Sequence, residues 1–585
     1  MTKHYLLAAD ADKIQDFIFR SAYLQEVIGG SHLLSRFCDE GLEALHTHYA
    51  GAKYKGKWVK GSQWDVIIND GGRFLLWFDD HKHTQEFGHD LVELYRRTIE
   101  GSLTIAVAAE NEGYNPESED EFTAARKKIE CRLKQAKSDT RGAKPAIHVP
   151  QMAFCASCGI ALALEHVPLY ENPMYLCSSC LNKGDERDYL RRSLKNKKYF
   201  INDFRQAIVD DKSNGFSEKH LWLPVKPVDA ISQFDPRSYV AYLIADCNSM
   251  GGFFNQCKTR SQMRALSEKL RAVLYHTLSK PVSLLKQRLE PKFGNQKCKA
   301  KEDRAFELKN ILPAVPLILG GDDIFLLLPA PYAVDFTKHF IKAFEDEMVK
   351  ALQSEEIKLD GKPTLSAAVV ICKSNYPYKL AHRHGEELLN RAKRMAKTFA
   401  NEPRSVIDVE VILSSERRST EPDEPRNSGY ESSLRPFWAN GDSNDAGISI
   451  QNLIAARTEL DKLPNKRLAQ LRPLYYSHKL PRDKQDSLAD WNQELEHLLG
   501  RVKRMEAPEM NTSPASGSQQ TDKDSLETKL RRVLKTLGDG NEQGQAGHWK
   551  NVKRGPEAFD AHALPDLLTM WDYCYDLDVP YENYQ

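Results

Sequence analysis

An internal repeat of four parts, present in two copies, constrains the fold of this chain more than any other feature of its sequence. In each copy, a short apolar strand that ends in aspartate is followed by a glycine-containing hairpin, another strand and an amphipathic helix with basic residues near its end. The first copy reads YLLAAD, NDGGRFLLWF, SLTIAVAA and FTAARKKIECRLKQAK, and the second reads YLIAD, GGDDIFLLLP, TLSAAVVI and GEELLNRAKRMAK. Because the parts recur in the same order, the pattern predicts a duplicated domain.

The order strand, helix, hairpin, strand and helix predicts an α+β domain whose helices pack on one face of a mainly antiparallel sheet, the ferredoxin-like arrangement of a palm. We therefore expect two palm domains, a cysteine-containing module between them and a helical domain after them. The predicted boundaries are 1–148 for a degenerate first palm, 149–230 for the module, 231–415 for the second palm and 416–585 for a linker and a C-terminal helical domain.

The bulk composition indicates several packed domains and says little about partners. Of the 585 residues, 41% are hydrophobic and 28% are charged, which is typical of a globular protein. The formal net charge is zero, so the whole molecule carries no charge that would attract nucleic acid or an anionic membrane. Two basic stretches, 126–144 and 187–198, are interpreted as solvated helix faces, with RNA contact as the alternative.

The N-terminal segment MTKHYLLAAD lacks the long apolar core of a secretory signal, and no apolar run reaches membrane-spanning length. We therefore expect a cytoplasmic protein with no membrane contact. In that compartment thiols stay reduced, so a cluster of cysteines favours metal binding over disulfides.

Four cysteines lie between the two copies of the repeat, in the pairs Cys155–Cys158 and Cys177–Cys180. Each CxxC places two thiolates on one tight turn, and eighteen residues separate the pairs. This spacing is typical of a tetrahedral site in which four thiolates bind zinc. A fully ligated zinc leaves no open position for chemistry, so the sequence predicts a structural Zn²⁺ site.

Three aspartates of the second copy are the predicted catalytic and metal-binding residues. Asp246 ends the first strand, and Asp322 and Asp323 follow two glycines in the hairpin turn. If the strands are neighbours, these carboxylates converge on two divalent cations, Mg²⁺ or Mn²⁺, which prefer oxygen ligands. Attack of a ribose hydroxyl on an α-phosphate builds negative charge on the entering and leaving oxygens, and two cations neutralise it. The pattern predicts chemistry on a nucleoside triphosphate.

Further residues are expected to contact that nucleotide. The two glycines of the turn allow phosphate to approach the backbone, and three lysines near the last strand and helix offer point charges, although exposure to solvent is the ordinary state of a lysine. The predicted nucleotide-binding residues are Asn248, Ser249, Gly320, Gly321, Lys373, Lys393 and Lys397.

These motifs together resemble the large subunit of type III CRISPR effector complexes, the Cas-ten family of Csm and Cmr systems. The resemblance spans nearly the whole chain and rests on DADKIQDFIF, LQEVIGGSHLLSRF, NDGGRFLLWF, the paired CxxC motifs, IADCNSMGGFF, LILGGDDIFLLLP and SAAVVICKSNYP with the following AKRMAK. It implies two palms of the nucleotidyl cyclase type packed face to face. It also implies synthesis of cyclic oligoadenylates from ATP, in antiviral defence, when a crRNA-guided complex with other effector subunits binds target RNA.

The chain departs from that family at three points. Many relatives have a carboxylate where this chain has Asn248, and Ala368 stands where relatives often have glycine. The first palm strand begins almost at residue 1, so the resemblance leads us to expect no N-terminal HD nuclease domain and no cleavage of single-stranded DNA.

Two other functions stay open. A stand-alone cyclase that makes a cyclic dinucleotide uses the same carboxylates, although it has no need of a duplicated palm, a zinc module or an extra helical domain. A catalytically silent scaffold that binds the crRNA complex is the other alternative. A silent site usually lacks its carboxylates, and the first copy does so, with Gly71 and Gly72 assigned to the places of Asp322 and Asp323. In the second copy, Asn248 in place of a carboxylate keeps this alternative open.

Overall fold

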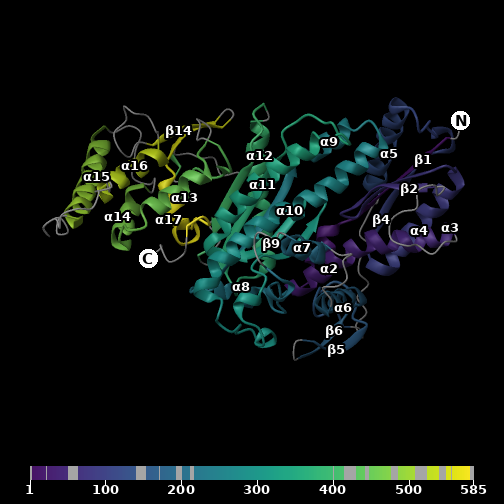
Figure 1. Cartoon of the computed structure of the whole chain (residues 1–585), viewed down its shortest axis with the longest axis horizontal. Coiled ribbons are helices and arrows are strands. Elements are labelled where there is room, and N and C mark those ends of the chain that lie inside the picture. Colours follow the sequence, from purple (N-terminus) through teal and green to yellow (C-terminus); the bar gives the residue numbers. More distant parts are fainter. Residues whose placement is uncertain are drawn as a thin grey trace.

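The computed structural model describes residues 3–21, 23–50, 64–139, 153–169, 172–192, 200–210, 216–399, 401–413, 430–431, 433–441, 447–475, 485–506, 524–538, 549–554 and 557–579. The basic stretches and the predicted linker lie partly outside these residues. The first palm stands at one end of an elongated molecule, the second palm is in the middle, and the C-terminal helices form the other end (Figure 1). The cysteine module lies on one side of the palms.

The first palm has a four-stranded antiparallel sheet. Its strands are β1 (Tyr5–Ala11), β2 (Trp64–Asp70), β3 (Arg73–Phe78) and β4 (Leu103–Val107), and its helices are α1 (Ile14–Phe19), α2 (Leu24–Arg36), α3 (Leu42–Ala50), α4 (His81–Ile99) and α5 (Glu119–Asp139). The strand order is β2-β3-β1-β4, so β1 is central. Asp10, near the end of β1, lies between Arg73 of β3 and Thr104 of β4.

The second palm repeats this arrangement. Its strands are β7 (Tyr239–Asn248), β8 (Val315–Gly320), β9 (Asp323–Pro329), β10 (Thr364–Lys373), β11 (Val406–Val411) and β13 (Phe437–Trp438), and its helices are α9 (Met250–Gln256), α10 (Arg260–Phe293), α11 (Ala333–Leu352) and α12 (Tyr378–Thr398). The order β8-β9-β7-β10 matches that of the first palm. Strands β7 and β10 are buried almost throughout, so they read as continuous apolar runs rather than alternating ones.

The duplication and the α+β class predicted from the sequence are thus confirmed, with two additions. A helix after each hairpin, α4 or α11, was not among the four predicted parts. The sheet of the second palm also continues with β11, parallel to β10, and with β13, antiparallel to β11. Since β13 lies at 437–438, this sheet extends beyond the boundary expected at 415.

The two palms pack against each other through one continuous hydrophobic core and several polar contacts. Arg126 of α5 is fully buried and donates to the backbone carbonyls of Phe254 and Asn255 at the end of α9, at 2.8 and 3.3 Å. Asp65 of β2 forms an ion pair of 2.6 Å with Arg264 of α10. These contacts fix the hairpin turn of each palm close to the other.

The cysteine module contains the hairpin of β5 (Glu165–Leu169) and β6 (Asn172–Leu176), followed by α6 (Ser178–Arg192). Helix α6 packs on α2 of the first palm, and the backbones touch at Gly29, where an added Cβ would lie 1.9 Å from the carbonyl oxygen of Lys183. Lys183 is itself buried and donates to the carbonyl of Phe17 and, at 3.2 Å, to Ser21. The module is therefore anchored to the first palm.

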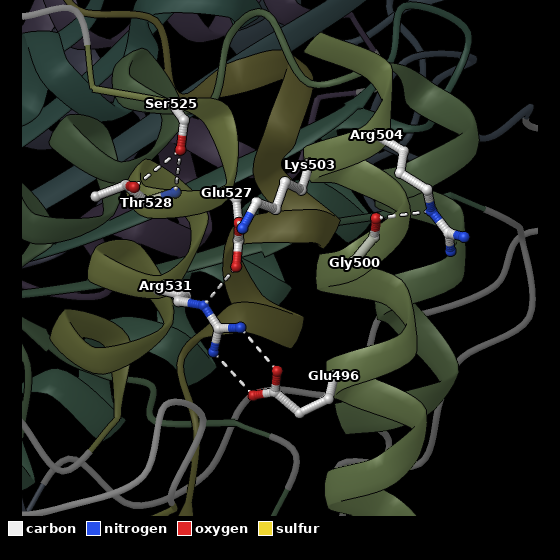
Figure 2. Close-up of polar contacts among 8 residues, drawn as sticks. All are labelled: Glu496, Gly500, Lys503, Arg504, Ser525, Glu527, Thr528 and Arg531. Carbon is white, nitrogen blue, oxygen red and sulfur yellow. Dashed lines mark hydrogen bonds and ion pairs between the residues drawn. The ribbon is translucent and has the colours of Figure 1, made fainter. Parts of the chain in front are cut away.

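The C-terminal region is helical, as expected, with α13 (Ile450–Glu459), α14 (Asn465–Tyr475), α15 (Gln485–Glu506), α16 (Leu526–Leu537) and α17 (Leu564–Met570). Helices α15 and α16 lie side by side, and the guanidinium of Arg531 forks between Glu496 and Glu527 (Figure 2). A small sheet of β12 (Tyr430–Glu431), β15 (Glu557–Ala561) and β14 (Lys550–Arg554), which the sequence pattern did not predict, lies in the same region.

In the described part of the chain, no helix combines the length and apolar character that crossing a membrane requires.

Candidate active site

The three predicted catalytic aspartates meet at one end of the second palm sheet. Strands β7 and β9 pair so that Asp246 lies directly opposite Asp323, and β8 and β9 pair Gly320 with Asp323 across a two-residue turn. Directly opposed residues in an antiparallel pair have Cα atoms about 4.5–5.5 Å apart. The strands are therefore neighbours, as convergence of the three carboxylates requires.

The local sequence explains the turn. Gly321 has φ of 61°, a left-handed conformation that glycine adopts without strain, and this allows β8 to reverse directly into β9. The apolar run after Asp323 then buries Ile324, Phe325 and Leu326 in the sheet. Asp322 and Asp323 are held at the edge where the buried strands end.

The carboxylates repel one another, and this repulsion contributes to raised pKa values of Asp322 and Asp323. Burial, then the charges of Asp322 and Asp246, raise the pKa of Asp323 from 3.8 to about 7. Burial, followed by the charge of Asp246, also raises the pKa of Asp322. Solvent reaches Asp323, but the carboxylate lies in a concave part of the surface where protein atoms surround much of it. This cluster of negative charge favours a bound cation.

Lys393 of α12 provides one positive charge at the site, with its Nζ 2.9 Å from Oδ2 of Asp246. Lys393, one of the predicted nucleotide-binding residues, thus lies beside Asp246, and its contact with a phosphate stays a prediction.

The oxygens of the three carboxylates are not gathered as tightly as the ligands of a single ion. Within the described residues, only the four cysteines form a group of three or more potential ligands whose donor atoms all lie within 4.8 Å of one another. Two-metal sites place their ions about 3.5–4 Å apart, so their ligand oxygens span a larger distance. The donor set of Asp246, Asp322 and Asp323 fits Mg²⁺ or Mn²⁺, which take carboxylates together with water and phosphate oxygens.

A cavity of about 210 Å³ adjoins the aspartates. Its polar lining includes Asp246, Asp323 and Lys393, and its aromatic lining is formed by Phe325, Phe19 and His382. The full lining is Gln15, Phe19, Ile244, Ala245, Asp246, Ile318, Asp323, Ile324, Phe325, His382, Glu386, Leu389, Asn390 and Lys393. Since Gln15 and Phe19 come from α1, both palms contribute to this cavity.

The aromatic wall joins the two palms. The rings of Phe19 and His382 lie with centroids 3.6 Å apart, and Phe325 is 5.2 Å from His382. Burial lowers the pKa of His382 to about 4, so its imidazole is neutral at physiological pH. Sequence reasoning missed this wall, although His382, Glu386 and Lys393 follow helical spacing and mark one face of α12.

Asn248 and Ser249 lie just beyond Asp246. The amide of Asn248 donates to Oγ1 of Thr364 at 3.1 Å and accepts from Oγ of Ser366 at 2.8 Å, so it ties the end of β7 to β10. Ser249 has φ of 58° and precedes α9. Asn248 thus has a structural role, and the nucleotide contacts expected of both residues stay predictions.

The first palm contains the same arrangement without the acidic turn. Asp12 accepts from Ser102 and, at 2.8 Å, from Thr104, whereas its counterpart Asn248 accepts from Ser366 and donates to Thr364. Lys137 lies 2.7 Å from Asp10, and its counterpart Lys393 lies 2.9 Å from Asp246. Strand pairing also corrects the sequence alignment of the two turns. Asp70 pairs with Arg73 across its turn as Gly320 pairs with Asp323, so Gly72 and Arg73, not Gly71 and Gly72, correspond to Asp322 and Asp323.

Lys373 is not part of the site, and its prediction was wrong. It pairs with Tyr239 at the opposite end of β7, and its Nζ donates to the carbonyl of Arg237 at 2.6 Å. Because β10 runs antiparallel to β7, its beginning, not its end, lies beside Asp246. Seven residues of strand, at about 3.3 Å each, separate Lys373 from Ser366, the partner of Asp246. Lys397 is exposed one helical turn beyond Lys393 and stays a prediction.

The four cysteines predicted to bind zinc lie together in the structure. All four are buried, and their sulfur atoms lie within 4.8 Å of one another, with 3.9 Å between Sγ of Cys158 and Sγ of Cys177. Zinc–sulfur bonds of about 2.3 Å in a tetrahedron place the sulfurs about 3.8 Å apart. The cluster therefore fits a structural Zn²⁺, as the sequence predicted.

Two palms that share one core, with three carboxylates and a lysine of the second beside a cavity that both palms line, define a duplicated palm protein with a candidate site for a nucleotide. The comparison with protein families identifies the palm that carries this site. Residues 239–399 match the family described as Cas10/Cmr2, second palm domain. The match confirms, over this segment, the resemblance to the large subunit of type III CRISPR effector complexes.

Solved structures with similarity to the chain have 14–15% identity. Csm1 in T. onnurineus aligns with a TM-score of 0.46, 14% identity, and coverage of 86% of this chain and 64% of that chain. A Csm1-Csm4 cassette in complex with cA4 aligns with a TM-score of 0.42 and 14% identity, over 87% of this chain and 63% of that chain. A cassette in complex with AMPPNP aligns with a TM-score of 0.39 and 15% identity, over 69% of this chain and 54% of that chain. The chain thus spans less than two thirds of the length of these proteins. No curated protein matches it.

Proposed function

We propose that this chain is a nucleotidyltransferase that converts ATP into cyclic oligoadenylates, as the large subunit of a type III CRISPR effector complex in antiviral defence. The observation that carries the proposal is the direct opposition of Asp246 and Asp323 across two central strands of a Cas10/Cmr2-type palm, with Asp322 in the adjoining turn. Csm1-Csm4 cassettes in complex with ATP, cA3 and cA4 support ATP as the substrate and a cyclic oligoadenylate as the product.

In the proposed reaction, a ribose hydroxyl oxygen of one nucleotide bonds to the α-phosphorus of another. The bond between that phosphorus and the pyrophosphate oxygen breaks, pyrophosphate leaves, and the hydroxyl proton is released. In a last step, the terminal hydroxyl of the oligomer attacks its own 5′ α-phosphorus, pyrophosphate leaves again with release of the hydroxyl proton, and the ring closes. Asp246, Asp322 and Asp323 would hold two divalent cations, which would supply positive charge beside the entering and leaving oxygens.

The other residues of the site bind and orient the substrate. Gly320 and Gly321 leave the backbone of the turn open to the phosphates, and Lys393 moves from Asp246 to a phosphate oxygen. The apolar and aromatic part of the cavity excludes water from one face of the nucleoside. Partner subunits, crRNA and target RNA belong to the same proposal, supported by the family match and by the Csm1-Csm4 cassettes.

The test is product analysis by mass spectrometry after incubation with ATP and Mn²⁺ or Mg²⁺, with and without a cognate RNA-guided complex. We expect cyclic oligoadenylates from the wild type and none from the double variant Asp322→Ala, Asp323→Ala. The matched control is Asp10→Asn, which changes the counterpart of Asp246 in the first palm and is expected to keep activity.

The same assay separates the alternatives. Turnover of GTP alone, to a cyclic dinucleotide, would identify the stand-alone cyclase. ATP consumption that is absent from the wild type under every condition would identify the silent scaffold. Consumption that persists unchanged in the double variant would show that the chemistry lies elsewhere, and the proposal would fail.

A further inference from the structure

The hairpin turn of the first palm touches the acidic turn of the second. A Cβ added to Gly71 would lie 3.8 Å from the Cα of Gly321, and one added to Gly320 would lie 3.9 Å from Oδ1 of Asp70. The two turns occupy equivalent positions in the two palms, so they meet where the duplicated domains face each other.

One side chain crosses this contact. Oδ2 of Asp70 accepts a hydrogen bond from the backbone N–H of Gly321 at 3.2 Å, while its Oδ1 accepts from the N–H of Gly71 at 2.8 Å. Gly320 occupies the position of Asp70 in the second palm and has no side chain, so the bond runs in one direction only. The first palm supplies the carboxylate, and the second palm supplies the amide.

Neighbouring groups hold Asp70 in place. The preceding residue, Asn69, donates from its side-chain amide to the carbonyl of Cys38 at 2.6 Å, which fixes the end of β2. Arg271 of α10 interacts electrostatically with Asp70 and donates from Nε to the hydroxyl of Tyr275 at 3.3 Å. The first palm thus fixes the end of the strand that carries Asp70, and the second palm provides a positive charge that interacts with its carboxylate.

We infer that Asp70 is a positioning residue, which fixes the Gly320–Gly321 peptide of the turn so that Asp322 and Asp323 present their carboxylates to divalent cations. The inference rests on the proposed function, because it concerns the same metal site. It gives Asp70 a role in a palm whose own turn, Gly71 and Gly72, is not acidic. A peptide N–H held by a carboxylate makes a charge-assisted hydrogen bond, stronger than one between neutral groups.

The test uses the full-length protein and two readouts that need no turnover. Binding of Mn²⁺ is followed by electron paramagnetic resonance, and amide hydrogen exchange is measured on peptides that cover 316–325. For Asp70→Ala we expect Mn²⁺ binding about tenfold weaker and faster exchange in the turn, because Gly321 loses its acceptor. For Asp70→Asn, whose side-chain oxygen can still accept, we expect Mn²⁺ affinity within about threefold of the wild type.

Asp65→Ala is the matched control. It removes a carboxylate from the same strand and breaks a contact between the palms, the ion pair with Arg264, at a distance from the turn. It should leave both readouts unchanged. Melting temperatures of the three variants show whether each protein is folded.

Each outcome decides the inference. If Asp70→Ala and Asp65→Ala lose Mn²⁺ affinity equally, the effect comes from palm packing. If Asp70→Ala and Asp70→Asn lose it equally, the effect comes from charge alone. Either result overturns the positioning role. If the wild type binds Mn²⁺ and Asp70→Ala binds it equally well, only this inference fails. If the wild type binds no Mn²⁺ at the aspartates, the proposed function itself fails.

Discussion

Replacing Asp323 with asparagine should stabilise the metal-free protein above neutral pH. The folded state holds this carboxyl with a pKa of about 7, because of burial and the charges of Asp322 and Asp246, whereas the unfolded chain has the ordinary value of 3.8. The folded state therefore binds the proton more tightly, and the wild type loses stability as the pH rises from about 4 to 7. Asparagine carries no charge at any of these pH values and avoids the loss.

The size of the gain follows from the same values. The rise in pKa from 3.8 to about 7 corresponds to about 4 kcal/mol at 1.36 kcal/mol per pH unit. Because solvent reaches the Asp323 carboxylate, screening reduces this to roughly 1–2 kcal/mol. For a domain of 150–250 residues, in which 1 kcal/mol shifts the melting temperature by about 2–4 °C, that raises the melting temperature by roughly 2–8 °C.

The assay is thermal unfolding of wild type and Asp323→Asn in chelator at pH 4, 5 and 8, followed by the same scans with Mn²⁺ at pH 8. We expect the gain to be largest at pH 8, smaller at pH 5 and near zero at pH 4, and Mn²⁺ to stabilise the wild type more than the variant. Asp346→Asn, which removes an exposed carboxylate of α11, controls for the lost charge. A gain equal at pH 4 and pH 8, or none at pH 8, would show that the charge of Asp323 does not destabilise the folded protein.

Three further changes test other parts of the structure. Lys393→Met should weaken binding of a fluorescent ATP analogue about tenfold by removing a charge from the site, and Lys397→Met in the same titration measures whether the neighbouring exposed lysine contributes. Cys177→Ser should release the bound zinc, measured by elemental analysis, and lower the melting temperature, since three thiolates no longer close the site. Arg126→Met should lower the stability of the palms by roughly 1–3 kcal/mol in denaturant titrations, because the carbonyls of Phe254 and Asn255 lose their buried donor.

The sequence predicted the features that depend on local pattern. The repeat of strand, hairpin, strand and helix was visible because the apolar runs of β7, β9 and β10 are long and end in recognisable turns. The zinc site was visible because the two CxxC pairs, Cys155–Cys158 and Cys177–Cys180, need no knowledge of the fold. The hairpin of β14 and β15 was missed because Lys550–Arg554 and Glu557–Ala561 are short and rich in charged residues, without alternating apolar positions.

Features that depend on strand direction or on contact between the palms were beyond sequence reasoning. Lys373 was misplaced because proximity in sequence to β10 does not reveal which end of that strand lies beside Asp246. Asp70 and Phe19 belong to the first palm, and only the packing of the two palms brings them to the second. The aspartates and Lys393 of the second copy could be named from the sequence, whereas the contacts of Asp70 and Phe19 with that copy could be seen only in the structure.

The most direct test of the account is a crystal structure with Mn²⁺ and a non-hydrolysable ATP analogue, with the ions located from their anomalous scattering. The account predicts two peaks about 4 Å apart, bounded by the carboxylates of Asp246, Asp322 and Asp323, with Nζ of Lys393 moved from Asp246 to a phosphate oxygen. Peaks that lie away from these three side chains, or a nucleotide bound with no Mn²⁺ between it and the aspartates, would contradict it.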